Sequence, residues 1–203
     1  MNETLWTSTH ASPLGTLRSA ARGDGALVAL GFEEAWSPLL ARLAVRFADP
    51  RVARGVPAHV AAAIEAYFAG EVTALDALPV DPAGTTFQRR VWAALRTIPA
   101  GETRSYAAVA TLVGAPRAVR AVGAANRANP VAIAVPCHRV IASDGALHGY
   151  AGGLERKRWL LAHERSRSQG MRQTPIALHP MNVGAGQSAS LEHGFVQKVP
   201  FTT

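Results

Sequence analysis

Two hydrophobic patterns organise the first eighty residues. Two runs with apolar residues, 14–20 and 26–32, flank the Gly-containing turn 22–25, which predicts a β-hairpin. Apolar residues recur at helical spacing over 38–47. The run 57–69 (PAHVAAAIEAYFA) begins with proline and is followed by glycine, the residues that favour a helix start and a helix end. The pattern predicts a small domain, residues 1–80, of mixed α+β class.

The segment 75–84 loses this regularity, carries Pro79, Pro82 and Gly84, and predicts a linker. A mostly helical second domain, residues 81–167, follows it. Its predicted elements are a helix over 86–98, short helices over 106–113 and 116–127, a β-type run over 131–135, and an amphipathic helix over 154–164.

The two short helices are joined by a tight Gly-Ala-Pro turn, which is typical of a helix-turn-helix. Beyond this domain, residues 168–203 are rich in polar residues and show no period, so we predict a largely disordered tail.

The charge is concentrated in the second domain. The whole chain of 203 residues has a formal net charge of +7. Residues 85–167 contribute thirteen basic and four acidic side chains, whereas residues 1–84 contribute six basic and nine acidic ones. A polyanion such as nucleic acid would therefore dock on the second domain, although a solvated basic surface fits the charge equally well.

No stretch is apolar and long enough to span a membrane, and residues 1–10 lack the pattern of a secretory signal. We therefore expect a cytoplasmic protein without membrane contact.

The chain has one cysteine, Cys137, which excludes an internal disulfide and a multi-cysteine zinc site. Cys137 ends an apolar run and precedes His138 and Arg139. Neighbouring cations or a base lower the pKa of a thiol and make it nucleophilic. An inert, buried cysteine is the alternative.

The second short helix carries a run of small residues that includes Ala121, Gly123, Ala124 and Ala125. Small side chains allow a close approach of the helix backbone, either to the narrow minor groove of DNA or to a neighbouring helix. A major-groove reader would present larger polar side chains.

Three segments together resemble one known family. They are TTFQRRVWAALRTIPAGETRSYAAVA, then RAVGAANRANP, then VPCHRVIASDGALHGYAGGLERKRWLLAHE. This order resembles the bacterial methylated-DNA–protein-cysteine methyltransferases, also called 6-O-alkylguanine-DNA alkyltransferases. The resemblance is strong over 85–164, looser before it and absent after 166. It implies a ribonuclease-H-like N-terminal domain followed by a winged-helix-like DNA-binding and catalytic domain.

The resemblance implies direct-reversal DNA repair by a suicide alkyltransferase. Cys137 would take a methyl or larger alkyl group from 6-O-alkylguanine, or from 4-O-alkylthymine, in one irreversible step and a single turnover. His138 would act through a water as base for the thiol, and Glu164 would orient the imidazole. Tyr106 would contact the DNA backbone and give a proton toward N3 of the purine.

Further residues match DNA-binding positions of the family. Arg120 matches the arginine that fills the stack when the damaged nucleotide is flipped out. Asn129 matches the residue that ties the helix-turn-helix to the active-site strand. Ser143 matches a DNA-backbone contact, and Tyr150 a wall of the base pocket.

Two residues differ from the usual residues of the family, and the resemblance also implies what the protein does not need. Ala151 stands where some members have serine, which predicts a roomier pocket that takes larger alkyl groups. Arg127 stands where small residues are frequent, and it could add a phosphate contact. The resemblance implies no cofactor, no metal, a monomer, and double-stranded DNA with alkylated bases as the partner.

Three other classes stay open. A lesion-binding protein without transfer would leave Cys137 unmodified. A helix-turn-helix regulator would prefer one DNA sequence. A cysteine hydrolase would turn over repeatedly, whereas a thioether ends the reaction after one event.

Overall fold

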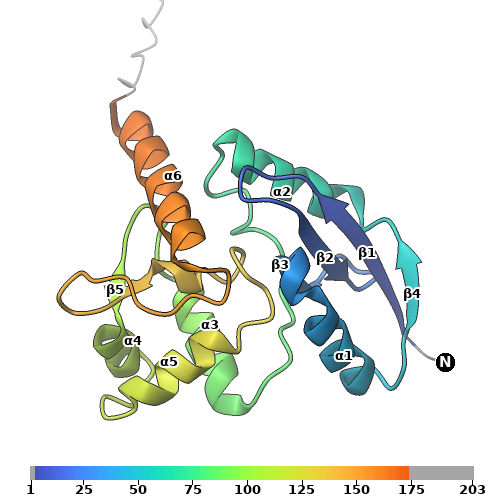
Figure 1. Cartoon of the computed structure of the whole chain (residues 1–203), viewed down its shortest axis with the longest axis horizontal. Coiled ribbons are helices and arrows are strands. Elements are labelled where there is room, and N and C mark those ends of the chain that lie inside the picture. Colours follow the sequence, from blue (N-terminus) through green and yellow to red (C-terminus); the bar gives the residue numbers. More distant parts are fainter. Residues whose placement is uncertain (1–2, 174–203) are drawn as a thin grey trace, which may run out of the picture.

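A four-stranded sheet forms the framework of the N-terminal half, in the strand order β3-β2-β1-β4 (Figure 1). β1 (Thr4–His10) pairs antiparallel with β2 (Leu17–Ala21) and parallel with β4 (Arg51–Arg54), and β2 pairs antiparallel with β3 (Leu27–Phe32). This computed structural model describes residues 3–173, with side chains as far as residue 167.

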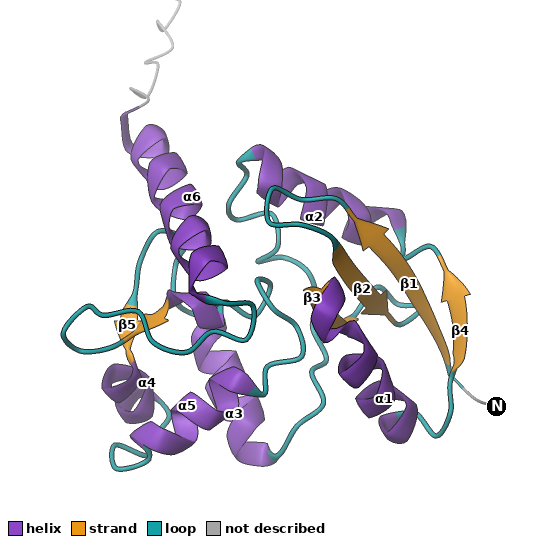
Figure 2. Cartoon of the chain, in the orientation of Figure 1, coloured by secondary structure: helices purple, strands orange, loops and turns teal. Residues whose placement is uncertain are grey.

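The two faces of the sheet are covered by different helices (Figure 2). α1 (Trp36–Arg46) follows the short 3-10 helix η1 (Glu33–Ala35), and its buried Trp36 and Leu43 pack in a cluster with Leu5 and Val28 of the sheet. α2 (Ala58–Ala69) belongs to the larger core, which continues into the C-terminal half. Each face of the sheet therefore packs against one helix, while β4 at its edge is mostly exposed.

The C-terminal half is mostly helical (Figure 2). α3 and α5 pack against each other, and the indole N–H of Trp92 on α3 donates a hydrogen bond to the Ala125 carbonyl of α5 at 2.9 Å. The elements are α3 (Thr86–Arg96), β5 (Arg104–Ser105), α4 (Tyr106–Leu112), α5 (Val119–Arg127), the 3-10 helix η2 (Cys137–Arg139), β6 (Val140–Ile141) and α6 (Leu154–Gln173).

The outer edge of β3 joins the two halves. The Leu27 N–H donates to the Pro79 carbonyl at 2.9 Å, in the segment that connects the halves. Further along the strand, the Leu30 N–H donates to the Pro130 carbonyl at 3.0 Å, and the Ala132 N–H donates to the Leu30 carbonyl at 2.7 Å. Because an exposed strand edge offers unpaired backbone groups, these contacts both protect the sheet and fix the loop that precedes Cys137.

Most of the predicted elements are confirmed, and so is the α+β class. The hairpin is β2–β3, and the helices over 38–47, 57–69, 86–98 and 106–113 correspond to α1, α2, α3 and α4. Gly70 ends α2 in the left-handed conformation, as its position after the helix predicts. The strands β1 and β4 were not predicted, because they contain few apolar residues.

Three boundaries differ from the prediction. The run 131–135 is a tight loop and not a strand, since Ile133 has a positive φ of 70° that reverses the chain. α5 begins at Val119 because residues 116–118 form the preceding turn. α6 continues to Gln173, past its predicted end at 164, so residues 168–173 of the predicted disordered tail are helical instead. The rest of the predicted tail lies outside the described residues.

No helix within residues 3–173 is long and apolar enough to cross a membrane.

The start of α3 gives a test of the fold. Thr85 and Gln88 form a capping box, in which the Gln88 N–H donates to the Thr85 hydroxyl at 3.3 Å and the Thr85 N–H donates to the Gln88 side chain at 2.9 Å. Thr85→Ala removes the acceptor and should lower the free energy of unfolding by about 1 kcal/mol. Urea denaturation measures it, with Thr85→Ser as the control that keeps the cap. An unchanged midpoint for Thr85→Ala would show that this cap does not stabilise the fold.

Candidate active site

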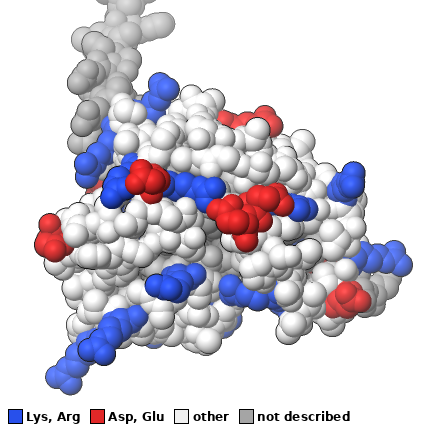
Figure 3. Space-filling view, viewed as in Figure 1, with Lys and Arg blue, Asp and Glu red and all other residues white. Residues whose placement is uncertain are grey.

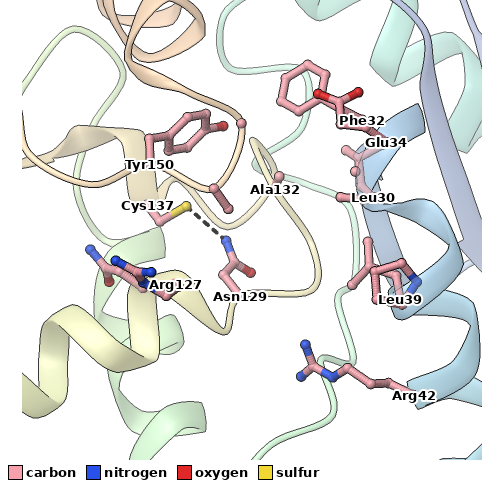
Figure 4. Close-up of a pocket in the computed structure, with 16 residues that line it drawn as sticks. Leu30, Phe32, Glu34, Leu39, Arg42, Arg127, Asn129, Ala132, Cys137 and Tyr150 are labelled. Atoms are coloured by element: carbon pink, nitrogen blue, oxygen red, sulfur yellow. Dashed lines mark hydrogen bonds between the residues drawn. The ribbon is translucent and has the colours of Figure 1, made fainter.

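A tight loop after α5 presents the single cysteine. Asn129 holds this loop: its Nδ2 donates to the Val135 carbonyl at 2.8 Å, and its Oδ1 accepts from the Val131 N–H at 3.0 Å. The same Nδ2 also donates to Sγ of Cys137 at 3.3 Å (Figure 4). Ile133, a β-branched residue, adopts its positive φ in this loop, and that conformation persists only where the surroundings fix it. Asn129 thus couples the end of α5 to the thiol.

The Cys137 side chain lies at the wall of a cavity of about 200 Å³ between the two halves (Figure 4). Asn126, Asn129, Tyr150 and Ala151 line it from the C-terminal half. The N-terminal half contributes mostly apolar side chains and two charged ones; the labelled residues are Leu30, Phe32, Leu39, Glu34 and Arg42. The thiol therefore faces a partly open, largely apolar space large enough for a small organic group.

Burial raises the pKa of the Cys137 thiol. The hydrogen bond from Asn129 and the positive charge of Lys157 act in the opposite direction but do not outweigh it. At neutral pH the resting cysteine is a thiol, so its reaction needs a group that takes the proton.

A buried carboxylate, Glu164 of α6, lies at the centre of the site. Its Oε1 accepts hydrogen bonds from His138 Nε2 at 2.8 Å, Arg139 Nη2 at 2.9 Å and Tyr67 Oη at 2.9 Å. Its Oε2 accepts from Arg139 Nε at 2.9 Å and from the Gly101 N–H at 3.2 Å. Burial alone would raise the pKa of Glu164, but His138 and Arg139 together hold that pKa far below its usual value. Glu164 is therefore ionised.

The Glu164 carboxylate fixes the tautomer of His138. An ionised carboxylate only accepts hydrogen bonds, so His138 Nε2 carries the proton that it shares with Glu164. Burial lowers the pKa of His138 more than the nearby Glu164 raises it. The imidazole is therefore neutral. Its Nδ1 is buried and has no hydrogen-bond partner in the described part of the chain. A neutral imidazole with a free Nδ1 lone pair can accept a proton.

The position of Arg139 beside Cys137 predicted a cation that lowers the pKa of the thiol, but Arg139 binds elsewhere. Its side chain binds Glu164 through two nitrogens and donates from Nη1 to the Ile98 carbonyl at 2.6 Å, all within the core. The cation that acts on Cys137 is Lys157 of α6, which is buried and donates to the Val140 and His148 carbonyls at 2.7 and 2.9 Å.

Three of the predicted DNA-binding residues line a second hollow. Tyr106, Arg120 and Tyr150 line a shallow hollow of about 810 Å³, together with the small residues Gly123 and Ala124 of α5. The Tyr106 hydroxyl donates to the His148 carbonyl at 3.3 Å, and Arg120 is exposed. In Figure 3, separate basic side chains project at the lower left of the molecule, where Figure 1 places α4 and α5. The small residues of α5 thus open this surface, and they do not serve only to pack helices.

Ser143 stands apart from both hollows. It is exposed in the turn that follows β6, where the Gly145 N–H donates to the Ala142 carbonyl at 3.0 Å.

Sequence reasoning missed three side chains of the site. Lys157 lies in the charged run ERKR, which is typical of a solvated helix surface. Tyr67 lies in the other half of the chain and had no signal. Asn126 stands among the small residues of α5, and the sequence gives no signal that its side chain lines the cavity. Within residues 3–173, no group of three or more His, Cys, Asp or Glu could hold a metal ion.

The family model described as "6-O-methylguanine DNA methyltransferase, DNA binding domain" matches residues 86–166. A methylated-DNA–protein-cysteine methyltransferase of Shigella flexneri is 43% identical over 157 residues, which cover 76% of this chain and 92% of the relative. The chain belongs to the methylated-DNA–protein-cysteine methyltransferase family. The family predicted from the three motifs is thereby confirmed.

Two further members of this methyltransferase family show how the likeness is distributed. The relative from Mycolicibacterium paratuberculosis is 59% identical over 115 residues, covering 55% of this chain and 69% of its own length. The crystal structure of Mycobacterium tuberculosis OGT in complex with DNA superposes with a TM-score of 0.69 at 45% identity, covering 80% of this chain and 94% of that one. The fold of a methyltransferase that binds DNA is therefore shared by this chain.

The charge of Lys157 gives a test of the electrostatics at the thiol. Lys157→Gln removes the cation that favours the Cys137 thiolate, so the pKa of the thiol should rise further. The rate of alkylation by iodoacetamide should fall at pH 7–8, and its pH profile should move to higher pH. Arg158→Gln, on the exposed side of the same helix, is the matched control and should leave the profile unchanged. Equal shifts in both variants would mean that general surface charge, and not Lys157, acts on the thiol.

Proposed function

We propose that this protein repairs alkylated DNA by direct reversal, moving an alkyl group from O6 of guanine, or O4 of thymine, to its own Cys137 once per molecule. The observation that carries the proposal is the arrangement around the thiol. Cys137 faces a cavity, and the neighbouring His138 is neutral with Nδ1 free, held by an ionised Glu164. Family membership gives this arrangement its substrate class.

The transfer is a single displacement at carbon. His138 Nδ1 takes the thiol proton through a water, and the Cys137 sulfur attacks the alkyl carbon. A C–S bond forms while the C–O6 bond breaks, and its electron pair stays on the base. Tyr106 gives a proton toward N3, so that guanine leaves as a neutral base. The product is a stable thioether, so each molecule acts once.

The reacting carbon is out of reach inside a duplex, so the nucleotide has to leave the stack. We assign Arg120 to the gap that it leaves, because Arg120 is exposed on α5 beside small residues that admit the DNA backbone. Tyr150 forms a wall of the base pocket, Asn129 fixes the thiol loop, and Ser143 contacts the DNA backbone. Ala151 lines both the cavity at Cys137 and the hollow beside α5, and its small side chain leaves room for larger alkyl groups.

The proposed function also includes the type of each domain, the DNA partner and the cellular location. We infer a ribonuclease-H-like domain over residues 1–80 and a winged-helix-like domain with a helix-turn-helix, α4–α5, over 81–167. The partner is double-stranded DNA with alkylated bases, bound by a monomer. A cytoplasmic location stays a prediction.

Covalent transfer is tested by intact-protein mass spectrometry. Incubation with an oligonucleotide containing 6-O-methylguanine should add one methyl group per protein, on the peptide that contains Cys137. Cys137→Ala should bind the oligonucleotide and take up no methyl group. Methyl removal in excess of the protein present would indicate a hydrolase, and tight binding without any transfer would indicate a lesion-binding protein.

Flipping and chemistry are separated by a second experiment. Arg120→Ala should slow repair of duplex DNA by about tenfold to a hundredfold. Without the arginine in the gap, nothing offsets the few kcal/mol that unstacking the nucleotide costs. Reaction with the free base 6-O-benzylguanine needs no flipping and should keep its rate. His138→Ala should slow both reactions, since each needs the thiol proton removed. If Arg120→Ala impaired the free-base reaction as much as the duplex reaction, Arg120 would belong to the active site and not to the DNA gap.

A further inference from the structure

Buried polar atoms without a hydrogen-bond partner are concentrated at one place. The described part of the chain has five such side-chain atoms, and three of them belong to Asn126 and Tyr150, namely Nδ2 and Oδ1 of Asn126 and Oη of Tyr150. Both residues line the cavity that Cys137 faces. Because burying a polar group without a partner destabilises a fold, such a cluster indicates groups that are paired only when a ligand is bound.

Asn126 is the more informative of the two. It lies in the last turn of α5, is only 6% exposed, and leaves both its donor and its acceptor unpaired. Its amide lies near the Tyr106 phenol, where it opposes the rise in the pKa of Tyr106 that burial causes, although no hydrogen bond joins the two side chains. Asn126 therefore lies near the residue assigned to the purine N3 and lines the same cavity as the reacting thiol.

We propose that Asn126 is a specificity-determining residue whose carboxamide hydrogen-bonds the flipped base at its 2-amino edge and so favours guanine over thymine lesions. This inference rests on the proposed function. A carboxamide is neutral and offers a donor and an acceptor side by side. In 6-O-alkylguanine the 2-amino group, a donor, lies between the acceptors N3 and N1; N1 is an acceptor because alkylation at O6 removes its proton.

The corresponding edge of 4-O-alkylthymine cannot satisfy the amide. It has the acceptors N3 and O2 and no exocyclic amine, so Oδ1 of Asn126 would stay unpaired in a buried site. Sites built to hydrogen-bond a substrate group discriminate strongly against analogues without that group, because their own polar atoms are then left without a partner. The preference for guanine therefore follows from the two side-chain atoms of Asn126, Nδ2 and Oδ1, that have no partner in the free protein.

The test combines a variant with a substrate change. Asn126→Leu is close in size and removes both polar atoms. In wild-type protein, replacing 6-O-methylguanine in the oligonucleotide by 6-O-methylhypoxanthine, which lacks the 2-amino group, should slow methyl transfer by about tenfold or more. In Asn126→Leu, transfer from 6-O-methylguanine should be slower by a similar factor, and loss of the 2-amino group should cause no further decrease. The variant's ratio of guanine to thymine repair should fall accordingly.

Stability separates this role from a structural one. Since the amide has no partner in the free protein, Asn126→Leu should melt at the same temperature as wild-type protein or higher, and Asn126→Ala gives a second variant without the amide. If the 2-amino group affects wild type and both variants equally, Asn126 does not read the base and the inference is wrong. If wild-type protein takes no methyl group from 6-O-methylguanine, the proposed function itself fails.

Discussion

The active site depends on one buried carboxylate. Glu164 accepts five hydrogen bonds from four residues that belong to different parts of the chain: Tyr67 of α2, Gly101 after α3, and His138 and Arg139 of η2. Removing one partner of a buried ion pair typically costs about 3–5 kcal/mol, because the other charge stays buried without compensation. The same contacts that orient His138 thus hold α6, the thiol segment and the N-terminal half together.

The second constraint is the attachment of the thiol loop to the sheet. Leu30 of β3 exchanges two backbone hydrogen bonds with the segment 130–132, and Asn129 links that segment to Val135 and to Cys137 itself. The cavity at the thiol is formed where this loop meets β3 and α1 (Figure 4). The N-terminal half therefore shapes the site from outside, although it supplies neither the nucleophile nor the base.

Local sequence patterns predicted the elements that have a strong period or clear end signals, such as α2 with its proline and Gly70, and α3 with its amphipathic face. They failed where long-range contacts decide the conformation. The segment 131–135 has the composition of a strand, but Asn129 and the edge of β3 bend it into a loop. β1 is central in the sheet, yet few of its residues are apolar, since much of its length is only half-buried.

In the site, too, local sequence predicts some residues, while others depend on long-range packing. The motif around Cys137, His138 and Glu164 could be found from sequence because the residue types are adjacent or belong to known motifs. Tyr67, Lys157 and Asn126 could not, since their functions depend on burial. A lysine in a charged run and an asparagine in a helix are ordinary surface residues until packing buries them.

The protonation of His138 tests the account most directly, because it depends on Glu164 being ionised and determines which nitrogen can accept the thiol proton. Nitrogen-15 NMR of histidine-labelled protein, with His138→Gln used to assign the signal, reports both ring nitrogens. Between pH 6 and 8 the account predicts a neutral ring with the proton on Nε2 and an unprotonated Nδ1. A ring protonated on Nδ1, alone or as imidazolium, would contradict it, because Nδ1 would then have no free lone pair to accept the thiol proton.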